Sequence, residues 1–103
     1  MEYRIIKSPS PGTVDILFRR RSSASTIPIE KYDAIGLVQG RLIDMVFAAD
    51  IAEKAAGVVV EDIKGHCPQN LILIAIFGDT ASVEAAMNQI QYKMKEARKG
   101  EFL

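Results

Sequence analysis

The chain has few of the residues that build metal sites and disulfides. Of its 103 residues, one is cysteine, one is histidine and none is tryptophan. A lone cysteine cannot form a disulfide within the chain, which excludes the covalent staple of small secreted domains. The 13 basic and 13 acidic residues leave no net charge. The summed electrostatic field therefore gives no reason to expect nucleic acid or an anionic membrane as a partner.

Long apolar runs are also missing. The most apolar stretch, "LILIAIF", is far shorter than the roughly 20 residues that span a bilayer, and the opening "MEYRIIKS" has no signal-peptide core. We therefore expect a cytoplasmic protein without a membrane partner. A hydrophobic content of 49% is ample for the core of one domain over residues 1–103.

The first third of the chain predicts short extended pieces. Prolines and a glycine close residues 1–12 as a strand and a turn. In residues 13–33, the alternation of Val14, Ile16 and Phe18 is typical of a half-buried strand, and a serine-rich connection follows. The run Arg19 to Arg21 is then the solvated end of that strand, since no aromatic platform for nucleic acid accompanies it.

Residues 34–100 have the pattern strand, helix, strand, strand, helix. The strands are "AIGLVQ", broken by Gly40, then "VVVEDI" and "LILIAIF", of which the last two form a hairpin or crossover pair around "KGHCPQN". "LILIAIF" lacks polar alternation, which indicates burial on both faces. Asp79 or Thr80 can cap the last helix. Its apolar face recurs at helical spacing, through Val83, Met87, Ile90, Met94 and Ala97.

The helix in "RLIDMVFAADIAEKAAG" is apolar over more than one face, and Gly57 lies where a left-handed C-terminal cap is expected. One face carries Leu42, Met45, Val46 and Ala49, and a second carries Ile43, Phe47, Ile51 and Ala55. One core does not need so wide an apolar arc. The pattern predicts that this helix also packs against a neighbouring subunit.

From "AIGLVQGRLIDMVFAADIAEKAAGVVVEDIKG" through "LILIAIFGDTASVEAAMNQI", the chain resembles the bacterial microcompartment (BMC) shell domain. Because "TVDILFRR" precedes "AIGLVQ", the order is similar to that of the circularly permuted subgroup. In that subgroup "RIIK" also resembles an N-terminal strand that joins five copies in a small barrel over the pore. The resemblance implies a permuted BMC domain of the α/β (α+β) class, with a ferredoxin-like mixed sheet, helices on one side and a short N-terminal strand.

The resemblance also implies partners and a place in the cell. It predicts a structural, non-enzymatic subunit that forms a flat homohexamer and tiles with other shell proteins around enzymes in a microcompartment. The loop between the two inner strands, with Gly65, His66, Cys67, Pro68 and Gln69, would line the central pore. Lys54 matches the edge residue through which neighbouring hexamers meet, although an ordinary exposed lysine paired with Asp50 fits the spacing equally.

Cys67 is the candidate for cofactor and metal binding. Its loop resembles that of permuted shell proteins from glycyl-radical-enzyme microcompartments, where the pore cysteine is associated with an iron–sulfur cluster. Thiolate sulfur is the usual ligand of such clusters, yet one chain supplies one thiolate. We therefore expect a cluster of the [4Fe–4S] type to be shared between subunits. His66 ranks as a pore-lining residue before a ligand, and Gly65 is expected to let the loop approach its copies.

Two alternatives remain open from the sequence. A thiol-redox protein could use Cys67 with His66 as its base, although adjacent residues on an extended loop tend to point in opposite directions. A trimeric ferredoxin-like regulatory protein that binds a small molecule would have the same order of elements. No catalytic constellation is visible in the sequence, which favours a non-enzymatic role.

Overall fold

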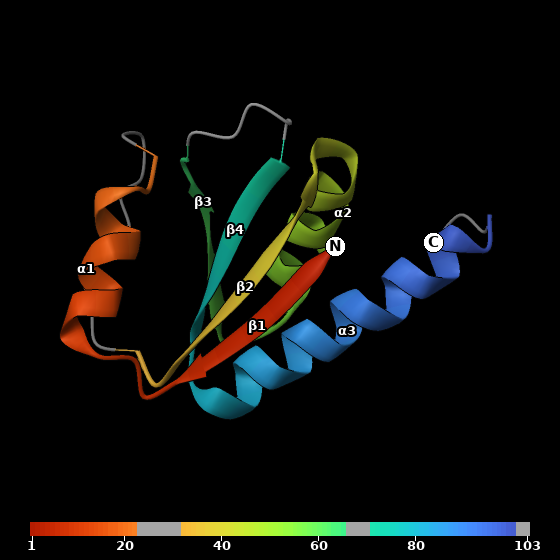
Figure 1. Ribbon diagram of the computed structural model, residues 1–103. Coiled ribbons are helices and arrows are strands. Elements are labelled where there is room, and N and C mark those ends of the chain that lie inside the picture. The colour runs from red at the N-terminus through yellow and green to blue at the C-terminus, as the bar shows by residue number, and fades with distance from the viewer. Residues whose placement is uncertain (23–31, 66–70, 101–103) are drawn as a thin grey trace.

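The computed structural model describes residues 1–22, 32–65 and 71–100. The elements, in chain order, are β1 (Glu2–Lys7), α1 (Pro11–Arg19), β2 (Ala34–Arg41), α2 (Leu42–Lys54), β3 (Val58–Ile63), β4 (Leu71–Gly78) and α3 (Thr80–Arg98). Helices α2 and α3 lie on one face of the sheet, and α1 lies on the other (Figure 1).

The sheet has the strand order β1-β2-β4-β3, and each neighbouring pair is antiparallel. The α/β fold class is confirmed, but the expectation of a mixed sheet is wrong for the described strands. Helix α2 does connect two parallel strands, β2 and β3. However, β4 lies between them and is antiparallel to both, which makes a split β-α-β arrangement.

The main core lies between the sheet and helices α2 and α3. Its buried residues are Ala34, Val38, Met45, Ala48, Ile51, Ala52, Ile74, Ile76, Val83, Ala86, Met87, Ile90 and Met94. The predicted apolar face of α3 is confirmed by the burial of Val83, Met87, Ile90 and Met94. Its start is confirmed too, because the Asp79 carboxylate accepts a hydrogen bond from the Ser82 amide at 3.2 Å.

Residues 13–19 were expected to form a strand, but they belong to helix α1. Ser10 caps this helix by accepting from the Thr13 amide at 3.3 Å, and Pro11 occupies the first turn, where its missing N–H costs nothing. The alternation was misleading, because Leu17 is 7% exposed whereas Ile16 is 50% exposed. The strand that precedes β2 and completes the sheet is therefore β1, at residues 2–7.

Helix α1 packs on the face of the sheet opposite α2 and α3. Leu17 and Phe18 form a second core with Ile35, Ile63, Ala75 and Phe77. The Phe18 and Phe77 rings stack with centroids 5.5 Å apart. Strand β4 is thus buried on both faces over Ile74–Gly78, as its unbroken apolar pattern predicts. The expectation of helices on one side alone is wrong, since it followed from reading α1 as a strand.

The N-terminal strand is present where the sequence predicts it, but it pairs within its own chain. The register runs from Glu2 opposite Gln39 to Lys7 opposite Ala34. β1 thus uses one of its edges along its whole length to extend the sheet, and the expected small barrel of five copies stays a prediction. Strand β2 also continues through Gly40 to Arg41, so this glycine does not end the strand. The predicted domain boundaries stay a prediction.

Helix α2 has the wide apolar surface that the sequence indicates, but its two faces divide differently. The buried stripe consists of Met45, Ala48, Ile51 and Ala52, and thus draws on both predicted faces. Leu42, Ile43 and Val46 are exposed, by 60%, 78% and 63%. Gly57 follows the helix with a φ of +81°, which confirms its predicted left-handed conformation.

Candidate functional site

The candidate site is the end of the sheet at which β3 stops and β4 begins. The two strands pair with Ile63 opposite Leu73, so residues 64–70 connect them at one edge of the molecule. His66, Cys67, Pro68 and Gln69 lie outside the described residues, and their expected roles stay predictions. Helix α1 ends and α2 begins at this same end of the sheet (Figure 1).

The backbone holds the end of α1 against the start of this connection. The Lys64 amide donates to the Arg20 carbonyl at 2.6 Å, and Arg21 forms an isolated β-bridge with Ile63. The Arg21 guanidinium lies over the Phe18 ring, 5.0 Å from its centroid. Two segments far apart in the sequence are therefore fixed together immediately before the predicted cysteine loop.

This junction forms a shallow groove whose lining is basic. The described residues around it are Arg19, Arg20, Arg21, Lys64 and Gly65, and the groove has a volume of about 230 Å³. Gly65 has open space around it, since an added Cβ would meet no atom within 4 Å. Among the described residues nothing therefore requires glycine there, and its expected approach to other copies stays a prediction.

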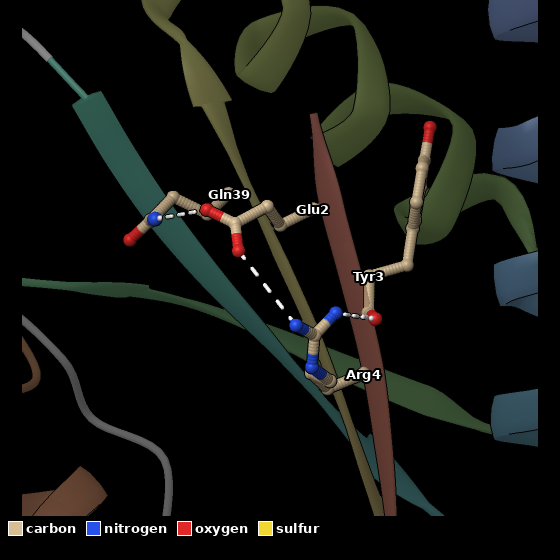
Figure 2. A network of polar contacts seen from close by, with 4 residues as sticks. All are labelled: Glu2, Tyr3, Arg4 and Gln39. Atoms are coloured by element: carbon tan, nitrogen blue, oxygen red, sulfur yellow. Dashed lines mark hydrogen bonds and ion pairs between the residues drawn. The ribbon is translucent and has the colours of Figure 1, made fainter.

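A polar network lies on the exposed face of β1 and β2, near the same end of the sheet. Figure 2 shows the Glu2 carboxylate between the Arg4 guanidinium, 3.7 Å away, and the Gln39 amide, 3.2 Å away. The Arg4 side chain also donates to the Tyr3 carbonyl at 2.8 Å. Both members of the ion pair are mostly exposed, so the network adds little to stability.

An apolar groove lies between α2, the start of β4 and the end of β3. Its lining residues are Leu42, Met45, Val46, Ala49, Asp62, Ile72 and Ile74, around a volume of about 210 Å³. Asp62 is the single charged residue among those described there. A continuous apolar surface of this kind on one chain is typical of a protein–protein contact.

Lys54 lies at the C-terminal end of α2 and is exposed. Its ammonium group is 2.7 Å from the Asp50 carboxylate, one helical turn earlier, which is the pairing that the spacing permits. A role of Lys54 at the edge of an assembly stays a prediction, because the structure describes one chain.

Two side chains near the helices have shifted acidity. Burial raises the pKa of the Tyr3 phenol, with Asp44 adding to the effect and Arg98 opposing it. Its hydroxyl points toward the Met1 sulfur, 3.6 Å away, and stays protonated at neutral pH. Hydrogen bonds from Ser82 lower the pKa of the Asp79 carboxyl, which keeps this helix cap ionised.

Among the residues that the structure describes, no group of three or more His, Cys, Asp and Glu side chains could hold a metal ion. A cofactor bound through Cys67 would therefore depend on the residues of the 66–70 connection and on other copies of the chain. In the described ranges, no helix has the length and apolar character needed to cross a membrane.

The basic groove is a feature that sequence reasoning missed. The arginine run was noticed, but the strand assignment directed it into solvent at a strand end. The capping serine followed by proline at residues 10 and 11 is the signal that could have identified α1. A helix that ends at Arg19 would then have placed the three arginines near the end of β3.

With the fold described, comparison with known proteins gives the family. The model of the BMC domain matches residues 34–103, which is more than half of the chain. The chain therefore belongs to the BMC domain family.

Two solved structures are similar over most of their length. The GrpU microcompartment shell protein from Clostridiales bacterium 1_7_47FAA is 57% identical, with a TM-score of 0.75, and the match covers 98% of this chain and 100% of that one. The GrpU shell protein from Pectobacterium wasabiae is 40% identical, with a TM-score of 0.70, and the match covers 87% of this chain and 99% of that one.

A more distant structure shares the fold. The fused permuted hexameric shell protein MSM0275 from the RMM microcompartment is 17% identical, with a TM-score of 0.68, over 91% of this chain and 45% of that one. No curated protein matches the chain.

Proposed function

We propose that this protein is a structural subunit of a bacterial microcompartment shell, whose copies bring their 64–70 connections to a common axis and share an iron–sulfur cluster through Cys67. Membership of the BMC family and the two similar shell proteins support the structural role. The shell of the microcompartment is accordingly the cellular location of the protein.

The observation that carries the assembly is the exposed apolar surface of α2. Leu42 and Val46 are each more than half exposed in one chain and border the apolar groove. Burial of one such side chain against a neighbour contributes about 1.5–3 kcal/mol. A closed ring uses such a surface in every copy, so no chain is left with an unpaired patch. We infer a homohexamer that contacts other shell proteins at its edges.

Solution mass tests this assembly. Native mass spectrometry and sedimentation should give six times the chain mass of 11.3 kDa. A trimer would favour the alternative of a ferredoxin-like regulatory protein, and a monomer would contradict the shared site.

The donor chemistry of the connection fits a cluster only in such an assembly. Each chain offers one thiolate, at Cys67, whereas a [4Fe–4S] cluster is ordinarily held by about four thiolates. Six symmetry-related cysteines cannot all bind its four irons. We infer that three or four bind and that solvent or a small ligand takes any open iron. When bound, the cluster would carry one electron at a time across the shell or report the redox state to it.

The described flanks of the connection agree with an anionic cofactor. Lys64 is the first residue of the connection after β3, and the end of α1 adds three arginines nearby. Positive charges close to a thiolate-ligated cluster stabilise its negative charge.

The cluster is tested by anaerobic reconstitution followed by iron and sulfide analysis. The expected result is about one cluster per hexamer, with absorbance from thiolate-to-iron charge transfer. Cys67→Ser should lose both the iron and the absorbance, whereas His66→Ala should retain them. Iron retained in Cys67→Ser, or no absorbance in the parent protein, would contradict this part of the proposal and leave the shell role standing.

A further inference from the structure

The strongest feature that the shell role does not use is the basic groove, which is lined by Arg19, Arg20, Arg21, Lys64 and Gly65. Its side chains come from two segments of the chain, the end of α1 and the residues after β3. A hydrogen bond of 2.6 Å from the Lys64 amide to the Arg20 carbonyl holds these segments together. The groove has a volume of about 230 Å³ and is open to solvent. A small anion would fit such a space.

Three of the cations that line this groove, Arg19, Arg20 and Lys64, form no ion pair with the acidic residues that the structure describes, whereas Arg21 has an interaction of its own. Within residues 1–22, 32–65 and 71–100, Glu2, Asp50, Glu84 and Glu96 form their ion pairs with Arg4, Lys54, Lys7 and Lys99. Glu61, which lies on β3, is buried and already has a partner. In the described part of the chain, no carboxylate pairs with Arg19, Arg20 or Lys64.

Stabilisation of the helix end explains only part of this cluster. Cations near a helix C-terminus interact favourably with its dipole, and Arg19 also donates to the Asp15 carbonyl at 3.3 Å. Lys64, however, follows the last residue of β3, and its exposed side chain has no intrahelical role. Like charges around one groove repel each other, and a bound anion would relieve that repulsion.

We propose that this groove binds a doubly charged phosphoryl anion, either inorganic phosphate or the phosphate of a small phosphorylated metabolite, beside the connection between β3 and β4. Guanidinium groups present planar pairs of N–H donors that match phosphate oxygens, and a lysine adds a compact charge. This function goes beyond the shell role and needs no cluster. The anion would be held at the same end of the sheet as the predicted pore loop.

The test is a titration of purified, cluster-free protein with inorganic phosphate at constant ionic strength, followed by calorimetry and by the amide resonances of Arg20 and Lys64. Arg20→Gln and Lys64→Gln should each weaken binding roughly tenfold, because each removes one charge-assisted hydrogen bond. Lys64→Arg should retain binding. Both residues replaced, Arg20 and Lys64, are exposed, so the melting temperature should be unchanged.

The matched control is Arg4→Gln. Arg4 lies near the same end of the sheet, and its loss changes the charge equally, but it is paired with Glu2 outside the groove. This variant should weaken phosphate binding less than about twofold. An equal loss in Arg4→Gln, or no saturable shift of the Arg20 and Lys64 resonances, would overturn the proposal.

Parallel titrations with glycerol phosphate and acetate identify the source of the anion. Binding of glycerol phosphate as tight as that of phosphate assigns the groove to phosphorylated metabolites, and binding of phosphate alone assigns it to the free ion. Acetate bound as tightly as phosphate would contradict recognition of a phosphoryl group.

Discussion

The two ends of the sheet differ in what their residues are used for. At one end, Gly78 packs on Gly57 and the Asp79 side chain caps α3, so small and polar residues serve the fold. At the opposite end, basic side chains and large aliphatic side chains stay exposed around residues 64–70. Residues at the first end stabilise the fold of the domain. Residues at the other end leave basic and apolar surfaces exposed in a single chain.

This difference predicts where substitutions act. Changes at the packed end should lower the free energy of unfolding, and changes at the loop end should alter assembly or binding while the domain stays folded. The reason is that marginal stability depends on buried contacts, whereas exposed side chains contribute little to it.

The largest expected effect is that of Gly78→Ala. A Cβ on Gly78 would lie 2.6 Å from the Gly57 carbonyl oxygen, and backbone cannot move aside as a flexible side chain can. We expect a loss of more than about 2 kcal/mol in the free energy of unfolding, measured by urea denaturation.

Gly65→Ala at the loop end is the matched control for this change. Its Cβ would meet no atom within 4 Å, so the free energy of unfolding should change by less than about 0.5 kcal/mol. Similar losses for the two variants would show that the two ends of the sheet do not differ in packing.

The next largest effect is expected in assembly, from Val46→Asp on α2. Val46 is 63% exposed in one chain and lines the apolar groove, so an aspartate there tests whether a neighbour covers it. Sedimentation should show loss of the hexamer, because burying an unpaired carboxylate in an apolar contact is costly. The dissociated variant should still show the melting transition of a folded domain.

Tyr92→Asp provides the comparison for that experiment. Tyr92 is 61% exposed on α3, away from the apolar groove, and its replacement should leave the assembly intact. Dissociation by both variants would indicate general loss of solubility or fold instead of a specific contact.

A smaller effect on stability is expected from Asp79→Ala at the packed end. The Asp79 carboxylate accepts the Ser82 amide, and this hydrogen bond lowers its pKa below the ordinary value of 3.8. The stabilisation is therefore fully present above pH 3.8 and is lost as the pH falls through the lower pKa of the folded state.

Melting curves at several pH values check this prediction. Asp79→Ala should melt at a lower temperature than the parent at pH 7, and the difference should shrink in acid. Asp79→Asn, which keeps a capping oxygen without a charge, should stay close to the parent at pH 7. A difference that persists unchanged in acid would mean that the carboxylate is not the cause.

The sequence predicted the parts of the fold that depend on local pattern. The strands at residues 58–63 and 71–78, the cap at Asp79 and the face of α3 followed from β-branched runs, turn residues and helical spacing. Helix α1 was missed because Val14, Ile16 and Phe18 alternate as in a strand. Only contact with the sheet, through residues such as Ile35, Ile63 and Phe77, buries Leu17 and Phe18. The burial of a nine-residue helix thus depends on a partner strand far away in the sequence.

The candidate site was predictable only in part, for a related reason. The single cysteine and the glycine and proline around it mark the loop in the sequence itself. The groove beside it depends on tertiary structure, since the contact of Arg20 with Lys64 spans more than forty residues and has no local pattern. Contacts between copies are harder still to predict from the sequence. They depend on exposed side chains such as Leu42 and Val46, and this exposure is known only from the folded chain.

The smallest effect on the single chain is expected from Lys54→Ala, and it separates the domain from the assembly most cleanly. The ion pair with Asp50 is exposed at both members, so its loss should cost about 0.3–0.5 kcal/mol. If Lys54 serves the edge of the hexamer, electron microscopy should show intact hexamers that no longer form extended sheets. Lys99→Ala also removes a helical lysine from an ion pair, with the half-buried Glu96 on α3, and should leave sheets unaffected. If Lys54→Ala forms sheets normally, the edge role of Lys54 is contradicted. The ion pair with Asp50 would then be the only role left for this lysine among the contacts described.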